Sequence, residues 1–237
     1  MKKRKITLGT TYYNNPEAIQ IFIDNHAEHA DELIIVDDGS PDFPLTDTIT
    51  PTEKIKIFRV KKDYGFNSHG CRNLIMTVAS NDWVVLMDSD RLFYNPEYSF
   101  NFFRKTPLLT HRRYTFVCHA GYVGNQIHES VNDFLICKQH FFSVGGYDEE
   151  FMGSRCGDRE FFIQLKTIGI DKNIPSIDVL LTRPSTLSMS SGHNTISPND
   201  VKLYMNDDMS TVVNERLYVP QPNKPILTFD WEQIETI

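Results

Sequence analysis

Long apolar runs and paired cysteines are both scarce in this sequence. No run approaches the roughly 18 apolar residues of a membrane-spanning helix, and no apolar leader follows Met1. The four cysteines form no Cys-x-x-Cys pair, which argues against a zinc knuckle or a small disulfide-linked fold. Such spacing favours free thiols in a reducing compartment. We therefore expect a cytoplasmic protein, free or peripheral to a membrane.

An excess of positive charge is also missing. The chain has 24 Lys and Arg against 31 Asp and Glu, for a formal net charge of −7. A protein of this charge has no broad electrostatic affinity for nucleic acid or anionic lipid. What is present is ordinary for a folded protein: 237 residues, 40% of them hydrophobic, with no internal repeat or low-complexity linker. We expect one continuous domain.

Strand-like and helix-like segments alternate in the first half of the chain. Strands are expected at residues 6–8, 32–36, 54–60 and 83–87. The second and fourth of these are continuous apolar runs, which are typical of strands buried on both faces. Helices are expected at 14–30, where Asn15 can cap and Pro16 suits the first turn, and at 68–80. This order predicts a largely parallel sheet with helices on both faces.

The pattern is less regular after residue 95. Strands are expected at 114–124, 133–138 and 176–183. A helix is expected at 157–169, with an inward face of Phe161, Phe162, Leu165 and Ile168. The acidic run Asp148-Glu149-Glu150 is expected to be a solvated loop.

Three polar clusters follow predicted strands. They are Thr10-Thr11-Tyr12, Asp37-Asp38-Gly39-Ser40 and Asp88-Ser89-Asp90. The last has little weight alone, because 19 aspartates would supply about one or two Asp-x-Asp triplets by chance. In parallel sheets, however, ligands bind at the carboxyl ends of strands. All three clusters are therefore expected at one ligand-binding edge.

Five short segments then occur in an order that matches a known family. They are TTYYNNPE at 10–17, IIVDDGSPD at 34–42, YGFNSHGCRN at 64–73, VVLMDSD at 84–90 and GGYDEEFMGSRCGDREFFIQL at 145–165. The series resembles the GT-A glycosyltransferases, most closely the family-2 group that uses nucleotide-diphospho-sugars. The resemblance implies a single α/β, Rossmann-like GT-A domain over residues 1–237. Its nucleotide-sugar-binding half would be at about 1–95 and its acceptor-binding and catalytic half at about 96–237.

The resemblance also implies a donor site and a metal site. The donor residues would be Thr10, Tyr12 and Asp38 at the nucleoside, Arg72 at the base or diphosphate, and Asp88 at the ribose or the water shell of the metal. Asp90 would bind a divalent Mn²⁺ or Mg²⁺ directly, and His193 in the loop SSGHNT would be a further ligand. A hard cation held by oxygen ligands neutralises a diphosphate leaving group.

The segment CGDREFF resembles the family's catalytic segment, with two departures. Gly157 stands where Glu is common, and Cys156 stands where Gly is common. The resemblance implies that Asp158 is the general base that takes the proton from the acceptor hydroxyl. Its place at the start of a helix would lower its pKa and keep it ionised.

Two further residues are expected on the acceptor side. Glu160 would hold acceptor hydroxyls, or would instead orient Arg155 or Arg159, and Tyr147 would line the acceptor side. The acceptor itself stays open: a surface polysaccharide, a lipid-linked sugar, a protein or a modified nucleic-acid base.

The expected reaction is transfer of a sugar from a nucleotide-diphospho-sugar, with uridine as the family's usual base, to an acceptor hydroxyl. One carboxylate base and no apparent nucleophile favour in-line displacement with inversion. A non-catalytic nucleotide-sugar-binding protein is a second possibility that the altered CGDRE segment allows. A nucleotidyltransferase is disfavoured, because TLGTTYYNNPE has one glycine and no basic residue where those enzymes place a Gly-rich basic loop.

Overall fold

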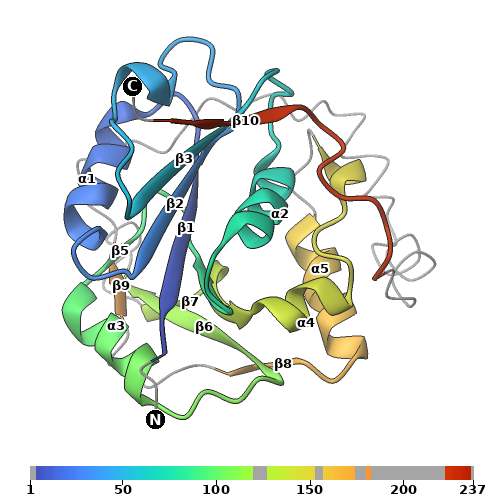
Figure 1. Ribbon diagram of the computed structural model, residues 1–237. Coiled ribbons are helices and arrows are strands. Elements are labelled where there is room, and N and C mark those ends of the chain that lie inside the picture. Colours follow the sequence, from blue (N-terminus) through green and yellow to red (C-terminus); the bar gives the residue numbers. More distant parts are fainter. Residues whose placement is uncertain (1–3, 120–126, 153–156, 174–179, 183–221, 236–237) are drawn as a thin grey trace.

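The structure is a computed structural model, and it describes residues 4–119, 127–152, 157–173, 180–182 and 222–235. Its ten described strands form one sheet in the order β10-β3-β2-β1-β4-β7-β6-β9-β5, with β8 paired to β6 (Figure 1). The strands are β1 Ile6–Tyr12, β2 Glu32–Asp37, β3 Ile55–Val60, β4 Trp83–Leu86, β5 Leu92–Phe93, β6 Arg112–His119, β7 Ile127–Cys137, β8 Asp171–Asn173, β9 Leu180–Thr182 and β10 Trp231–Ile234. The helices are α1 Pro16–His26, α2 Ser68–Val78, α3 Pro96–Lys105, α4 Lys138–Ser143 and α5 Gly157–Thr167, with short 3₁₀ turns η1 Leu45–Asp47 and η2 Glu149–Phe151.

The sheet has a parallel centre, as the alternating pattern predicts. Strands β3, β2, β1 and β4 pair in parallel, and β7 then runs antiparallel to β4. Every residue of β2 and β4 is buried, which confirms the two apolar runs as strands covered on both faces. The carboxyl ends of β1, β2 and β4 therefore meet at one edge, where the polar clusters lie.

Helices cover both faces of this sheet. Figure 1 shows α1 and α3 on one side and α2, α4 and α5 on the other. Side chains of α1 and α3, such as Phe22 and Phe100, pack with one buried cluster. Side chains of α2, α4 and α5, such as Leu74, Phe141 and Phe161, pack with the other. The arrangement confirms the expected α/β fold with a mostly parallel central sheet.

The predicted start of α1 is confirmed in detail. Pro16 begins the helix, and the side chain of Asn15 accepts a hydrogen bond from the Ala18 N–H at 3.1 Å. The predicted inward face of α5 is wrong at one position. The helix ends at Thr167, and Ile168 lies beyond it with 37% of its surface exposed. The chain turns there because Gly169 adopts a left-handed φ of +80°.

The C-terminal strand β10 was not predicted from the sequence. It pairs antiparallel with β3 at the edge of the sheet. Its approach is held by Glu149, whose carboxylate accepts hydrogen bonds from the Leu227 N–H, the Thr228 N–H and the Thr228 hydroxyl, each at 2.8 Å. The expectation of a solvated loop is therefore wrong at Glu149, which is 8% exposed and joins the C-terminal segment to the body of the fold.

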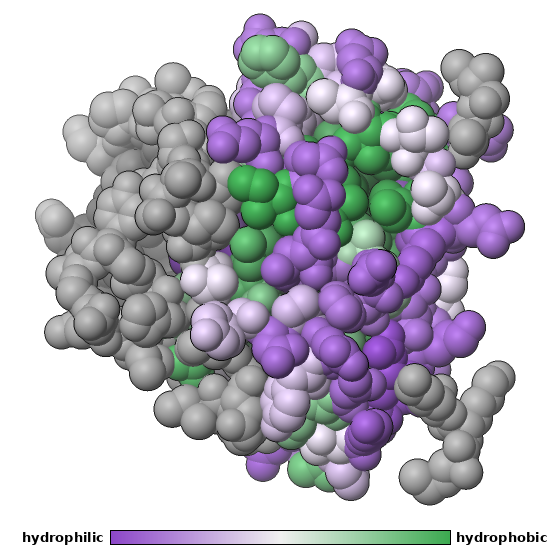
Figure 2. All heavy atoms as spheres, turned by 90° about the vertical axis from the view of Figure 1, so that its left-hand side faces the viewer, coloured by the Kyte–Doolittle hydropathy of each residue, from purple (hydrophilic) through white to green (hydrophobic). Residues whose placement is uncertain are grey.

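The surface on the α1 side mixes polar and apolar areas. Figure 2 shows hydrophilic side chains surrounding a smaller hydrophobic area in the upper half of the view. Large apolar side chains that are well exposed, such as Phe43 and Tyr94, lie apart in the sequence. Among the described helices, none is long and apolar enough to cross a membrane.

Candidate active site

Arg72 is the centre of the site. It lies on α2 and is 3% exposed. Its guanidinium donates from Nη2 to Asp88 Oδ1 at 2.7 Å, and from Nη1 to Asp158 Oδ1 at 3.2 Å and to the Tyr147 hydroxyl at 3.1 Å. Burial acts to lower the pKa of Arg72, but the combined effect of Tyr147, Asp158 and Asp88 is larger and raises this pKa above its usual value. The guanidinium therefore stays charged. One fixed cation thus joins the end of β4 to the start of α5.

Asp158 is the second residue of α5, as predicted. Its Oδ1 accepts from the Tyr147 hydroxyl at 2.9 Å as well as from Arg72, while its Oδ2 lies 3.6 Å from Nε2 of His69. Burial acts to raise the pKa of Asp158, but the neighbouring imidazole of His69 and the charge of Arg72 lower it to about 2. The carboxylate is therefore ionised at neutral pH, and its side-chain partners are the main cause.

The two residues expected on the acceptor side are both buried. The Tyr147 side chain is fully buried and stacks on Phe161, with ring centroids 4.3 Å apart. Its hydroxyl faces Arg72 and Asp158, and a place for Tyr147 on the acceptor side stays a prediction. Glu160 is 7% exposed, and its Oε1 accepts from Gln164 Nε2 at 2.6 Å. Acceptor contact by Glu160 stays a prediction.

The two aspartates after β4 have different neighbours: Asp88 contacts Asp133 on β7, and Asp90 lies near Arg91 in its own loop. The Asp88 N–H donates to Asp133 Oδ1 at 2.7 Å, and the Ser130 hydroxyl donates to Asp133 Oδ2. Arg91 Nε lies 3.7 Å from Asp90 Oδ1 and 4.0 Å from Asp133 Oδ2. Burial raises the pKa of Asp133 to about 7, and the charge of Asp88 raises it too.

Sequence reasoning missed Asp133. It sits in β7, in a segment that reads as an apolar strand, and no motif marks it. In the sequence, Asp133 directly precedes the apolar run 134–137. The structure shows that it is fully buried, and a buried carboxylate needs partners.

The expected nucleoside residues lie at the ends of β1 and β2. Thr10 and Tyr12 are both 1% exposed, and the Tyr12 hydroxyl donates to the Phe43 carbonyl, so this side chain is used by the fold. Asp38 Oδ2 accepts from the Asn67 N–H at 2.8 Å, and burial raises the pKa of Asp38 to about 8. Asp38 Oδ1 and both side-chain polar atoms of Asn67 have no hydrogen-bond partner among the described residues. Unsatisfied buried groups of this kind suit a ligand that completes them.

The expected metal ligands are only partly described. His193 lies outside the described residues. Within the described ranges, no group of three or more His, Cys, Asp or Glu side chains is placed to hold a metal ion. Asp88 and Asp90 nevertheless supply carboxylate oxygens of the right chemistry. Mg²⁺ and similar hard cations often bind one or two carboxylates and take their remaining ligands from substrate phosphates and water, so the donor set fits a cation bound together with a diphosphate.

The departure at Gly157 has a steric explanation. A Cβ atom built on Gly157 would lie 2.8 Å from His69 Nε2 and 2.9 Å from His69 Cδ2. The imidazole therefore occupies the space in which a side chain at position 157 would begin.

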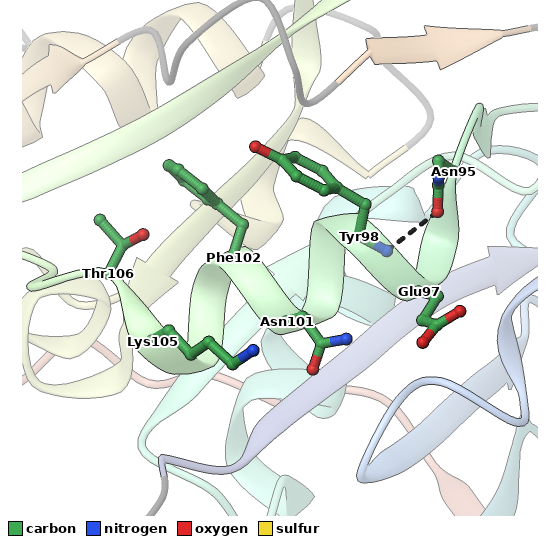
Figure 3. Close-up of a pocket in the computed structure, with 7 residues that line it drawn as sticks. All are labelled: Asn95, Glu97, Tyr98, Asn101, Phe102, Lys105 and Thr106. Atoms are coloured by element: carbon green, nitrogen blue, oxygen red, sulfur yellow. Dashed lines mark hydrogen bonds between the residues drawn. The ribbon is translucent and has the colours of Figure 1, made fainter.

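A surface cavity of about 500 Å³ lies elsewhere, along α3. Figure 3 shows Tyr98 and Phe102 on one side of this helix and Asn101 and Lys105 on another. Helix α3 packs on the face of the sheet opposite α2 and α5. This cavity is not part of the Arg72 site.

Comparisons with known proteins bear on the family and the fold. The family model described as "Glycosyl transferase family 2" matches residues 7–99, and "Glycosyltransferase like family 2" matches residues 93–195. No curated protein matches the sequence.

Among solved structures, one match is the mannosyltransferase PcManGT from Pyrobaculum calidifontis in complex with GDP-Man and Mn²⁺. The TM-score is 0.56 at 15% sequence identity, and the match covers 78% of this chain and 59% of that one. This chain thus corresponds to little more than half of the neighbour's length, and the likeness shows a shared fold.

Proposed function

Because this chain belongs to the family-2-like glycosyltransferases of the GT-A fold, we propose that it transfers a sugar from a nucleotide-diphospho-sugar to an acceptor hydroxyl. One observation carries the proposal: Arg72 binds Asp88 and Asp158 at once. Asp88 belongs to the Asp-x-Asp triplet on the donor side, and Asp158 is the expected base. A transferase that displaces a diphosphate needs these two functions next to each other.

Asp158 acts as the general base in this proposal. Its Oδ2 takes the proton of the acceptor hydroxyl while that oxygen forms a bond to the anomeric carbon. The bond from the anomeric carbon to the diphosphate oxygen breaks, and the nucleoside diphosphate leaves with the electron pair. Among the described residues, Asp158 is the carboxylate that Arg72 Nη1 contacts; one carboxylate base and no nucleophile favour in-line displacement with inversion of the anomeric configuration.

The donor side uses the residues at the strand ends. Thr10, Tyr12 and Asp38 would surround the nucleoside, and Arg72 would face the diphosphate. Asp90, with Asp88 nearby and His193 as a further ligand, would hold the divalent cation. When bound, this cation would neutralise charge on the diphosphate leaving group. Mn²⁺ is the first choice, since the PcManGT structure contains it, and Mg²⁺ is the alternative.

The donor base has two candidates. The family resemblance favours uridine, whereas the PcManGT structure contains GDP-Man. Asp38 lies at the end of β2, where the family resemblance places the nucleoside, and its buried carboxyl is close to both Asn67 and Cys71. A thermal-shift screen of UDP- and GDP-sugars with Mn²⁺ would decide between them.

A test of the proposal compares the wild type with Asp158→Asn. This variant keeps the shape of the side chain and removes its ability to take a proton. We expect nearly unchanged binding of the nucleotide and Mn²⁺ by calorimetry. We also expect loss of transfer and of the slow hydrolysis of the nucleotide-sugar. Near-normal turnover by Asp158→Asn would contradict the assignment of the base.

A second variant addresses the metal. Asp90→Ala should lose the part of nucleotide affinity that depends on Mn²⁺, measured by calorimetry with UDP or GDP in the presence and absence of the ion. Equal affinities with and without Mn²⁺ in the wild type would remove the metal from the proposal. A wild type that binds nucleotide-sugars tightly but neither transfers nor hydrolyses any of them would instead be a binding protein.

A further inference from the structure

His69 has an unusual environment beside the proposed base. It is the second residue of α2 and is 1% exposed. Its ring lies against Tyr147, with centroids 5.2 Å apart, and against Phe66, at 5.6 Å. Neither ring nitrogen has a hydrogen-bond partner at ordinary distance among the described residues. Buried polar groups are nearly always paired, so this imidazole needs an explanation.

The nearest polar group is the carboxylate of Asp158. Nε2 of His69 lies 3.6 Å from Oδ2 of Asp158, slightly beyond hydrogen-bond length. The two oxygens of Asp158 are not equivalent. Oδ1 already accepts from Arg72 and Tyr147, whereas His69 provides the contact to Oδ2. Oδ2 is therefore the oxygen left to receive a proton, and His69 is the group that can fix its direction.

The ring has little freedom to move away. On one side it meets the backbone of Gly157, where a Cβ atom would lie only 2.8 Å to 3.0 Å from three of its ring atoms. Its aromatic neighbours hold it on other sides. A residue packed this closely can set the orientation of an adjacent carboxylate.

We propose that His69 is a positioning residue that acts through Asp158, donating an Nε2–H hydrogen bond to Oδ2 so that the remaining lone pair of this oxygen faces the acceptor hydroxyl. The proposal rests on the proposed function for its catalytic meaning. The pairing itself can be tested without activity, because it requires one particular tautomer of the imidazole.

The first measurement is the ¹⁵N spectrum of the histidine side chains at pH 8. His69 should carry its proton on Nε2. His26 is a built-in reference with the opposite tautomer, because its Nδ1 faces the Phe22 carbonyl at 2.8 Å and its Nε2 accepts from the Phe93 N–H at 3.1 Å. A His69 proton on Nδ1 would overturn the inference, whatever the protein's activity.

The second measurement compares two variants with different chemistry. His69→Phe keeps an aromatic ring between Tyr147 and Phe66 but has no donor. His69→Gln loses the ring but places an amide N–H at a similar reach. We expect kcat to fall by about 10- to 100-fold in the Phe variant, as for other residues that orient a functional ligand. The donor KM should change by less than about twofold, and the Gln variant should recover most of kcat.

The possible results separate the two proposals. A Phe variant with wild-type kcat would show that only ring packing matters and would overturn the inference. So would a folded Gln variant that is as slow as the Phe variant. A wild type that shows the Nε2–H tautomer but no transfer with any nucleotide-sugar would instead count against the proposed function.

Discussion

The buried carboxylate of Glu149 accepts four hydrogen bonds. The effect of Glu149→Gln on stability can be worked out from them. Glu149 Oε1 accepts from Asn73 Nδ2 and the Leu227 N–H, and Oε2 accepts from the N–H and hydroxyl of Thr228, all at 2.8 Å. In Glu149→Gln the amide can keep the first pair. Its NH₂ group would then face the Thr228 N–H, from which it cannot accept, and the Thr228 hydroxyl, which would have to turn and accept from the amide.

The expected loss follows from these two bonds. A hydrogen bond to a charged group contributes about 1.5–3 kcal/mol, so losing the bond from the Thr228 N–H and replacing the charged bond of the hydroxyl by a neutral one costs about 3 kcal/mol together. For a chain of 150–250 residues, 1 kcal/mol shifts Tm by about 2–4 °C. Glu149→Gln should therefore lower Tm by about 6–12 °C in calorimetry. Hydrogen exchange should speed up first in β10 and in the segment around Thr228.

A matched control lies on β10 itself. Glu232 is 49% exposed and pairs with Lys61 at 3.5 Å, so Glu232→Gln should change stability by less than about 0.5 kcal/mol. A Glu149→Gln protein that melts within 1 °C of this control, with unchanged exchange in β10, would refute the reasoning. The effect should also reach the site, because the Asn73 side chain both donates to Glu149 and binds the backbone N–H and carbonyl of Tyr147.

Two other perturbations give effects of known sign. Burial lowers the pKa of His26 to about 3 from 6.5, so between these values the unfolded chain binds a proton that the folded chain does not. Stability from this group is complete above pH 6.5 and falls on acidification, by about 2 kcal/mol at pH 5. In urea titrations the stability difference between wild type and His26→Gln should shrink by that amount from pH 7.5 to pH 5, and a constant difference would contradict it. Gly157→Ala places a Cβ atom against the His69 ring and should destabilise by about 1–3 kcal/mol through overpacking. A neutral result by the same titration would show that the ring can move aside.

Local chemistry explains what the sequence predicted well. The apolar runs of β2 and β4 could only be satisfied by burial on both faces, and the cap at Asn15 is a property of four consecutive residues. Because parallel strands share a carboxyl edge, the clusters that contain Asp38 and Asp88 could be placed together without a structure.

Long-range pairing explains what the sequence could not give. Glu149 meets Thr228 across 79 positions, and Asp88 meets Asp133 across 45. Glu149 and Asp133 look like an ordinary surface residue and an ordinary strand residue when the sequence is read alone. Strand β10 has only four residues, two of them well exposed, so neither apolar periodicity nor length marks it. Its pairing depends on a β3 edge that exists only in the folded sheet.

Arg72 also affects the strength of the proposed base, Asp158. A carboxyl with a pKa of about 2 holds a proton weakly, and the charge of Arg72 is one cause of that value. The same guanidinium also binds Asp88 at the donor side. A bound diphosphate would bring further negative charge to Arg72 and withdraw part of its effect from Asp158, since the summed field of nearby charges sets the pKa. The kcat profile, which reports groups in the donor complex, should place the Asp158 ionisation at a higher pH than the kcat/KM profile, which reports the free enzyme.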